Sequence, residues 1–244
     1  METINLCQSL NWDSEIFGRK IARVTQTRLN DAEMHEILAW CAANAMACLY
    51  FAAEANDPNT VKLAEQNGFN LVDVRLTFER PLADAAALGD PIGKHGIRLS
   101  ALTDIPFLKP IAKVSYRNAR FYYDAHFPTA QCDALHEAWI ENSCKGYAEA
   151  VLVADSQNRP SGYITCHLPD PLTGNIGLVG VSAEAQGKGL GRILVEAGFQ
   201  WFAEQGVKTV TVVTQGRNVK AQRLYQKCGF LTSAVQLFYH RWFQ

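Results

Sequence analysis

Hydrophobic residues beyond position 96 recur with two different periods. Leu190, Leu194 and Trp201 share one face at helical spacing, which predicts an amphipathic helix that stops at Gly206. The β-branched run that follows is typical of a buried strand. In chain order, we predict strands and helices at 97–99 (β), 104–116 (α), 132–145 (α), 149–154 (β), 163–167 (β), 175–181 (β), 189–205 (α), 207–214 (β), 218–228 (α) and 231–242 (β). This order indicates a mixed α/β sheet flanked by helices.

A helix end, a glycine and an alternating strand occur twice along the chain. Residues 63–69 (LAEQNGF) resemble residues 224–230 (LYQKCGF), and the same offset aligns Val74 with Val235. Short units of this kind also arise by chance, but here the matching alternation continues beyond the motif. The repeat therefore indicates that the N-terminal part of the chain is a partial copy of the C-terminal part.

The segment 81–96 is rich in Ala, Gly and Pro and is predicted to link two domains. We expect a smaller α/β domain at 1–90 and a catalytic domain at 91–244. The first domain lacks a glycine-rich turn, and Ala64 stands where the second copy has Tyr225. The chemistry is therefore expected in the second domain.

A glycine-rich turn lies between the strand at 175–181 and the helix at 189–205. Helix starts carry unpaired backbone N–H groups and the positive end of the helix dipole, so this turn suits a pyrophosphate. The spacing fits neither a dinucleotide-binding fingerprint nor a Walker loop, and a purely structural turn is the remaining alternative. The candidate residues are Gln186, Gly187, Lys188, Gly189, Leu190, Gly191 and Arg192.

The pattern Gln-x-x-Gly-x-Gly in this turn, together with the helix and Gly-Phe pair at 218–230, resembles the acyl-CoA signature of the GNAT acetyltransferases. The resemblance covers about residues 95–244 and implies a GNAT fold with acetyl-CoA as co-substrate. It also implies that the strand before the turn separates from its neighbour and offers its backbone to the pantetheine arm. The cofactor-binding residues that the resemblance adds are Leu178, Val179, Val181 and Asn218.

Acetyl transfer to an amine needs a neutral amine, a stabilised oxyanion and a proton for the departing thiolate. Tyr225 follows Asn218 by about two helical turns, so both lie on one face, and a tyrosine hydroxyl can supply that proton. From the residues alone, a place in a buried apolar stripe is the favoured interpretation of Tyr225. The resemblance favours Tyr225 as the catalytic acid.

Across both domains the chain is similar to the N-acetyltransferases that act on dTDP-4-amino-4,6-dideoxygalactose in surface-glycan pathways, such as those of lipopolysaccharide or enterobacterial common antigen. This resemblance implies a nucleotide-sugar acceptor and an acidic general base at Asp73, acting directly or through a water. Asp73 could instead be a solvated charge at a strand end. The stretches that carry the resemblance are LNWD (10–13) with IFG (16–18), GFNLVD (68–73), RFY (120–122) and WIEN (139–142).

The segment 116–127 combines basic and aromatic residues in a predicted loop. Such side chains can stack on a thymine and bind a diphosphate, so Arg120 and Tyr123 are candidate acceptor-binding residues. The aromatic residues could equally be ordinary anchors of the loop.

The composition limits the classes of partner that the protein is expected to bind. The net charge is −1 without long charged runs, which argues against nucleic acid, and no apolar stretch is long enough to span a membrane. We expect a cytoplasmic protein, and the resemblance alone suggests a homodimer. No metal-ligand spacing is found, and the seven cysteines are predicted to be small buried hydrophobes. The alternative functions are acetylation of another small amine and a non-catalytic acyl-CoA sensor.

Overall fold

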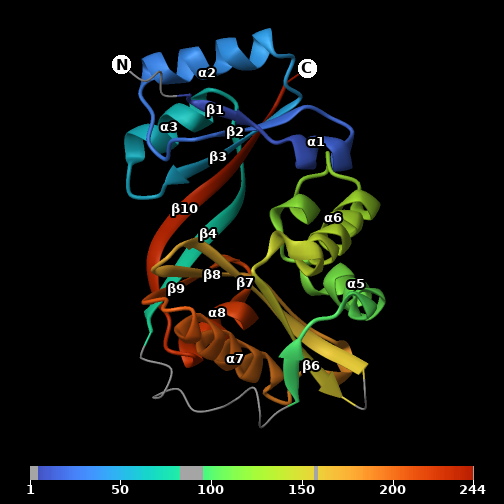
Figure 1. Cartoon of the computed structure of the whole chain (residues 1–244). Coiled ribbons are helices and arrows are strands. Elements are labelled where there is room, and N and C mark those ends of the chain that lie inside the picture. Colours follow the sequence, from blue (N-terminus) through green and yellow to red (C-terminus); the bar gives the residue numbers. More distant parts are fainter. Residues whose placement is uncertain (1–4, 83–95, 157–158, 244) are drawn as a thin grey trace.

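The computed structural model describes residues 5–82, 96–156 and 159–243, and the strands of this part form one ten-stranded sheet (Figure 1). The strand order is β1-β2-β3-β10-β4-β9-β8-β7-β6-β5. The strands are β1 (Cys7–Ser9), β2 (Ile21–Val24), β3 (Cys48–Glu54), β4 (Asn70–Pro81), β5 (Ile97–Leu99), β6 (Ala150–Ser156), β7 (Arg159–Asp170), β8 (Thr173–Val181), β9 (Thr209–Gln215) and β10 (Leu231–Trp242).

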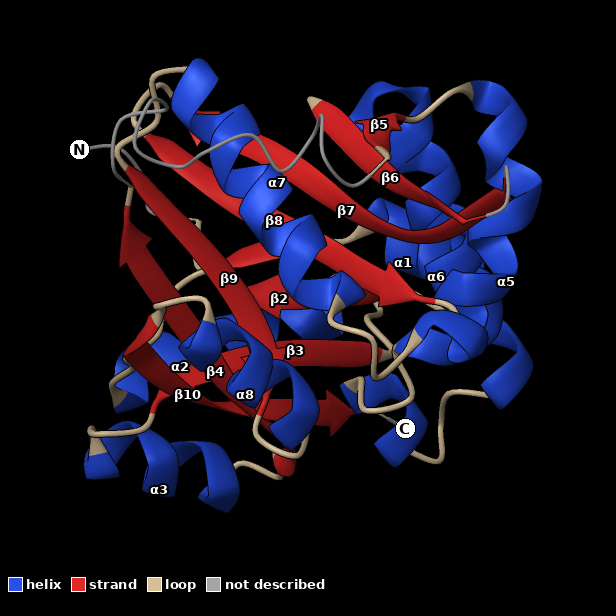
Figure 2. Cartoon of the chain, turned by 90° about the horizontal axis from the view of Figure 1, so that it is seen from below, coloured by secondary structure: helices blue, strands red, loops and turns tan. Residues whose placement is uncertain are grey.

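Helices cover both faces of this sheet. Helix α7 lies across β6, β7 and β8 on one face, and α5 packs against β7 and β8 on the other (Figure 2). The α-helices are α1 (Asn11–Phe17), α2 (Asp31–Ala43), α3 (Pro58–Gln66), α5 (Ile105–Ser115), α6 (Thr129–Asn142), α7 (Leu190–Glu204) and α8 (Val219–Lys227). Short turns of other helical types are η2 (Leu102–Asp104), η3 (Arg120–Tyr123), η4 (Ser143–Tyr147) and η5 (Ala183–Ala185).

Every strand and helix predicted beyond residue 96 is present, with differences at the ends. Helix α6 begins at Thr129 rather than at 132 and continues into a π-type turn, in which Gly146 adopts a φ of 105°. Asp104 precedes α5, but its side chain does not cap that helix. Its carboxylate instead accepts the Ala101 N–H at 2.7 Å and pairs with Arg98 at 2.7 Å.

The two predicted copies match in length. Helices α3 and α8 each span 9 residues, and the strands that follow them, β4 and β10, each span 12. Val74 lies opposite Leu237, and Leu76 lies opposite Val235. Because the repeat aligns Val74 with Val235 and Leu76 with Leu237, the two copies face each other reciprocally across the β4–β10 ladder.

The two halves of the chain exchange their final strands. Strand β10 pairs with β3 on one side and with β4 on the other, although β3 and β4 belong to the N-terminal half. Strand β4 in turn pairs with β9 of the C-terminal half. In Figure 1 these two long strands run through the waist of the molecule and join its upper and lower parts.

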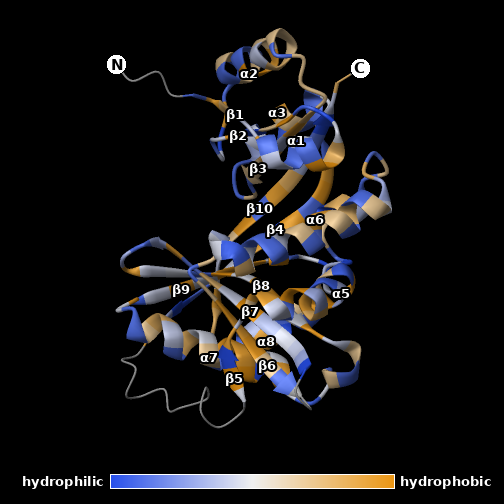
Figure 3. Cartoon of the chain, turned by 45° about the vertical axis from the view of Figure 1, so that its right-hand side comes forward, coloured by the Kyte–Doolittle hydropathy of each residue, from blue (hydrophilic) through white to orange (hydrophobic). Residues whose placement is uncertain are grey.

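This topology bears on the division at residues 1–90 and 91–244, which stays a prediction. One continuous sheet crosses the division, and the predicted linker lies largely outside the described residues, which omit 83–95. Apolar clusters fill both parts (Figure 3). One lies under α7 and α8, one under α2 and α3, one between α5, α6 and the sheet, and one at the waist around Phe17, Tyr50 and Phe121.

Candidate active site

Strands β8 and β9 pair along only part of their length. Their parallel ladder runs from Thr173 opposite Thr209 to Ile176 opposite Val212, and then stops. Beyond that point β8 remains paired with β7 as far as Val181, whereas β9 follows β4 as far as Gln215. The strands therefore separate, as predicted, and leave an opening between two edges of backbone.

Two amides on β8 show how this opening is lined. The Leu178 N–H donates to the Thr165 hydroxyl at 2.8 Å, so this predicted pantetheine contact is already occupied within the sheet. The Val179 amide lies near the Tyr116 hydroxyl, where it opposes the rise in pKa that burial causes, and this hydroxyl lies 3.0 Å from the Tyr163 hydroxyl. Val179 therefore places a backbone donor on the cavity wall, at a position where it can meet a substrate oxygen.

The glycine-rich turn has the backbone that its sequence requires. Gly187 and Gly189 adopt φ values of 77° and 80°, in the left-handed region that glycine tolerates best. Gly189 precedes α7 without any side-chain cap. Within the described chain, the N–H groups of residues 187–191 donate to no protein acceptor. These amides and the dipole of a 15-residue helix suit a pyrophosphate.

The charged side chains of this turn are exposed, and its glutamine forms a hydrogen bond to the end of β8. Lys188 and Arg192 are exposed, and Arg192 pairs with Glu196 one helical turn further on, at 2.7 Å. The Gln186 amide donates to the Val181 carbonyl at 3.2 Å and so ties the turn to the end of β8. Neither cation is buried, and both are accessible to a charged ligand.

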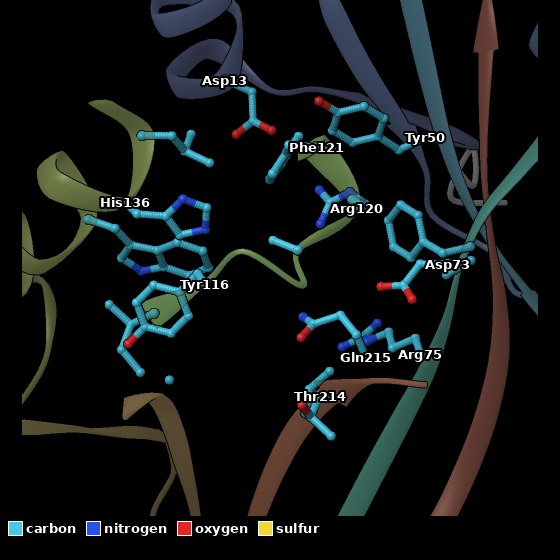
Figure 4. A pocket seen from close by; sticks show the side chains of 18 of the residues that line it. Asp13, Tyr50, Asp73, Arg75, Tyr116, Arg120, Phe121, His136, Thr214 and Gln215 are labelled. Atoms are coloured by element: carbon cyan, nitrogen blue, oxygen red, sulfur yellow. The ribbon is translucent and has the colours of Figure 1, made fainter. Parts of the chain in front are cut away.

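A cavity of about 950 Å³ begins at the opening between β8 and β9 and extends into the N-terminal half. Its lower wall includes Leu178, Val179, Asn218 and Tyr225, whereas the residues of the glycine-rich turn do not line it. Figure 4 shows Asp73 and Arg120 on one side and His136 on the other. The cavity thus joins the predicted catalytic strand to side chains of both halves of the chain.

Tyr225 is both a core residue and a cavity residue. Its ring packs against Phe78 and Phe230, and only 6% of the residue is exposed. Burial raises the pKa of its hydroxyl, which therefore stays protonated at neutral pH. Asn218 lies on the same wall, but its side chain caps α8 by accepting the Ala221 N–H at 3.2 Å. The two alternatives for Tyr225 are therefore compatible.

Asp73 lies within β4 and is 6% exposed, so it is not a solvated charge at a strand end. Burial raises the pKa of its carboxyl, and Arg217 at 3.7 Å opposes that rise. Its Oδ1 accepts the Val74 N–H at 2.9 Å. A desolvated carboxyl on the cavity wall is a suitable position for a general base.

The two predicted acceptor residues separate in the structure. Arg120 lines the cavity, with its guanidinium carbon 4.1 Å from the Phe121 ring centre. Tyr123 is 54% exposed and does not line the cavity. Its ring instead supports Arg217, whose guanidinium carbon lies 3.6 Å from the ring centre. Tyr123 therefore touches the partner of Asp73 rather than the cavity itself.

Two cavity residues carried no signal in the sequence. Arg75 projects from β4 into the cavity, two residues after Asp73 on the same face of the strand. His136 is buried and donates from Nδ1 to the Cys132 carbonyl at 2.7 Å, which leaves Nε2 unprotonated. Burial lowers its pKa to about 4, so the ring is neutral. Only the alternation of β4 placed Arg75 beside Asp73, and nothing in the sequence singled out His136.

Residues 114–230 match a family model described as "Acetyltransferase (GNAT) family". This range contains the separated strands, the glycine-rich turn and Tyr225. The chain carries a GNAT acetyltransferase domain. It is an acyl-CoA-dependent N-acetyltransferase with the GNAT fold, as its sequence predicted.

Individual relatives agree with this GNAT assignment. A dTDP-fucosamine acetyltransferase from Escherichia coli O6:H1 is 23% identical over 237 residues, which cover 96% of this chain and 97% of that protein. A mycothiol acetyltransferase from Rhodococcus erythropolis is 38% identical over 199 residues, which cover 78% of this chain and 64% of that protein. The structure of a GCN5-related N-acetyltransferase from Sphaerobacter thermophilus superposes with a TM-score of 0.62 at 16% identity, over 97% of this chain and 76% of that one.

The residues of this GNAT enzyme fit acetyl-CoA. The unpaired amides of residues 187–191 would hold its pyrophosphate, and the opening between β8 and β9 would admit its pantetheine arm. Acetyl-CoA supplies the activated acetyl thioester. Among the described residues no cluster of His, Cys, Asp or Glu could hold a metal ion, and no helix there is long and apolar enough to cross a membrane. The seven cysteines are free, and all but the half-buried Cys144 are buried.

Replacing Gly189 by Val is expected to raise the KM for acetyl-CoA about tenfold, because a left-handed backbone costs a non-glycine residue about 1–2 kcal/mol. Steady-state kinetics with varied acetyl-CoA measures this. Gly206→Val is the matched control, since Gly206 has a φ of 83° at the other end of α7 and is equally open. Equal KM values in the two variants would exclude a role of the turn in binding.

Proposed function

We propose that this GNAT enzyme transfers the acetyl group of acetyl-CoA to the 4-amino group of a dTDP-4-amino-4,6-dideoxyhexose in surface-glycan biosynthesis. The observation that carries the proposal is the alignment with the Escherichia coli dTDP-fucosamine acetyltransferase, which extends through both halves of the chain. The N-terminal half would then supply the acceptor side of the site. A relative that shared only the acetyl-CoA site would not require this half.

The volume and the aromatic lining of the cavity support a large acceptor. Its volume of about 950 Å³ lies at the upper end of the range for small-molecule sites, about 300–1,000 Å³. Trp12 of α1 and Trp139 of α6 both line it, with ring centres 6.1 Å apart. Aromatic walls of this kind suit a nucleobase or a sugar ring. A small aliphatic amine would leave most of this space unfilled.

The proposed roles follow from the position of each group. Asp73, whose pKa is raised by burial, accepts a proton from the acceptor ammonium directly or through a water. The Val179 N–H is the donor available to the oxyanion that forms when the amine attacks. Tyr225, kept protonated by burial, supplies the proton that the thiolate needs. Each role uses a group on the wall of one cavity.

The acceptor is tested by acetyl transfer with purified enzyme, followed by mass spectrometry of the product. dTDP-4-amino-4,6-dideoxygalactose is compared with its 3-amino isomer and with spermine. We expect turnover with the 4-amino sugar and at least a hundredfold lower kcat/KM with the others, about 3 kcal/mol of discrimination. Preferential turnover of spermine or of the 3-amino isomer would refute the proposed acceptor while leaving the acetyl-CoA site intact.

The identity to a mycothiol acetyltransferase favours a second candidate acceptor, which is the acceptor of that enzyme. The mycothiol acetyltransferase of Rhodococcus erythropolis has the higher identity, 38%, although this chain covers only 64% of its length. The acceptor of that enzyme therefore belongs in the same panel. Preferential turnover of it would replace the nucleotide sugar in the proposal.

A further inference from the structure

Three arginines from three different elements line the N-terminal part of the cavity. Arg23 lies on β2, Arg75 on β4 and Arg120 on η3, and all three belong to the cavity wall. Arg23 is exposed at the surface, whereas Arg75 and Arg120 are half-buried. Figure 4 shows the side chains of Arg75 and Arg120 on the same side of the cavity as Asp73.

Among the residues that the structure describes, no carboxylate pairs with Arg75, although a desolvated guanidinium usually has such a partner. Its hydrogen bond to a side chain goes to the neutral Gln236 amide, at 3.3 Å. Burial lowers the pKa of Arg75, and the nearby cations Arg120 and Arg23 lower it further. A partly buried positive charge that faces other positive charges is costly unless an anion joins it.

Aromatic rings hold the Arg120 guanidinium, and no hydrogen bond joins its side chain to another residue in the described part of the chain. Its guanidinium carbon lies 4.4 Å from the ring centre of Phe238 and 4.8 Å from that of Tyr50. Its Nε is buried without a hydrogen-bond partner. Stacking of this kind fixes the plane of the guanidinium and leaves its N–H edges for a ligand.

The carboxylates of the cavity do not balance these charges. Three arginines face two carboxyls, those of Asp13 and Asp73. Arg217, which is not part of the cavity wall, lies beside Asp73 at 3.7 Å. Burial raises the pKa of both carboxyls, and the charge of Arg120 opposes the rise in each of them. The cavity wall therefore carries more guanidinium groups than carboxyls.

We infer that Arg75 and Arg120 form a binding site for the diphosphate of an organic acceptor, with Arg23 at its mouth. The inference rests on the proposed function, and it adds the part of the acceptor that this half of the chain recognises. A planar guanidinium binds phosphate oxygens through paired N–H donors, so two of them match the two phosphates of a nucleoside diphosphate. This site is separate from the glycine-rich turn, which does not line the cavity.

The kinetic test compares two acceptors that share one amino sugar, the dTDP-linked sugar and its uncharged methyl glycoside. Arg75→Gln is expected to raise the KM for the dTDP sugar about ten- to hundredfold, as expected for lost hydrogen bonds to a charged group, and to leave the KM for the glycoside unchanged. Arg75→Lys retains the charge and is expected to show a smaller rise. Arg28→Gln is the matched control, because Arg28 is exposed on the N-terminal half and outside the cavity. Equal effects on both acceptors would overturn the inference.

A binding test separates the inference from the proposed function. Calorimetry measures the affinity of dTDP for enzyme saturated with coenzyme A, so that the glycine-rich turn is already occupied. We expect binding that Arg75→Gln and Arg75→Lys weaken and that Arg28→Gln does not. Such binding without acetyl transfer to the amino sugar would refute the proposed acceptor and support the diphosphate site. Turnover with dTDP affinity unchanged in both Arg75 variants, or no binding to the unaltered enzyme, would refute the diphosphate site.

Discussion

Replacing Tyr225 by Phe is expected to lower kcat by about 10²- to 10⁴-fold, the usual contribution of a general acid. The hydroxyl is the only group removed, and the ring that packs on Phe78 and Phe230 stays in place. The KM for acetyl-CoA is expected to change little, because the glycine-rich turn is untouched. Acetyl-transfer assays at saturating concentrations of both substrates measure kcat directly.

Tyr239→Phe is the matched control for Tyr225→Phe. Tyr239 is buried as well, but its hydroxyl donates to Glu65 at 3.2 Å and lies outside the cavity. Its loss is expected to lower the free energy of unfolding by about 1 kcal/mol and to leave kcat unchanged. If Tyr225→Phe retained full kcat, Tyr225 would be a core residue, and Tyr116 beside the Val179 amide would become the candidate acid.

Removing β10, by ending the chain at Gly229, is expected to unfold both halves of the protein. The deleted strand pairs with β3 along one edge and with β4 along the other, and it contributes the fully buried Tyr239 and His240. Loss of a buried aromatic residue alone costs about 3–5 kcal/mol, comparable with the total stability of many domains. Circular dichroism, thermal unfolding and acetyl-CoA binding would report the loss.

Co-expression of residues 230–244 as a separate peptide provides the control for this deletion. Recovery of acetyl-CoA binding with the peptide would show that the strand itself is required, rather than the length of the chain. A truncated protein with an unchanged melting temperature would contradict the exchange of strands between the halves. Folding of the C-terminal half alone would contradict it as well, since β4 would then be dispensable as the neighbour of β9.

Local features of the fold could be predicted from the sequence because their causes are local. The left-handed Gly189 and the stripe that contains Leu194 define the start and the buried face of α7 without reference to the rest of the chain. The repeat also predicted two matching units of helix and strand. It could not predict their exchange, because β4 and β10 resemble each other, and local propensity does not determine which neighbour each strand takes.

The residues of the candidate site also differ in whether the sequence could predict them. Tyr225 and the glycine-rich turn belong to a motif pattern of one family, so the resemblance to that family suggested their chemistry. Arg75 and His136 acquire their properties from burial, and Arg75 also from Arg120, which is distant in the sequence. Tyr123 shows the reverse case, since its residue type suggested a ligand contact but the fold directs it to Arg217.

The exchange of strands also constrains how the protein can be made. Domains usually fold as units, with the N-terminal one first, while the ribosome is still adding residues. Here the N-terminal sheet lacks its central strand until β10 emerges, and β10 follows the other nine described strands along the chain. The facing edges of β3 and β4 therefore stay unpaired until β10 has been synthesised, a state in which exposed strands are prone to aggregate. Synthesis of β10 is thus the event that allows both halves of the sheet to close.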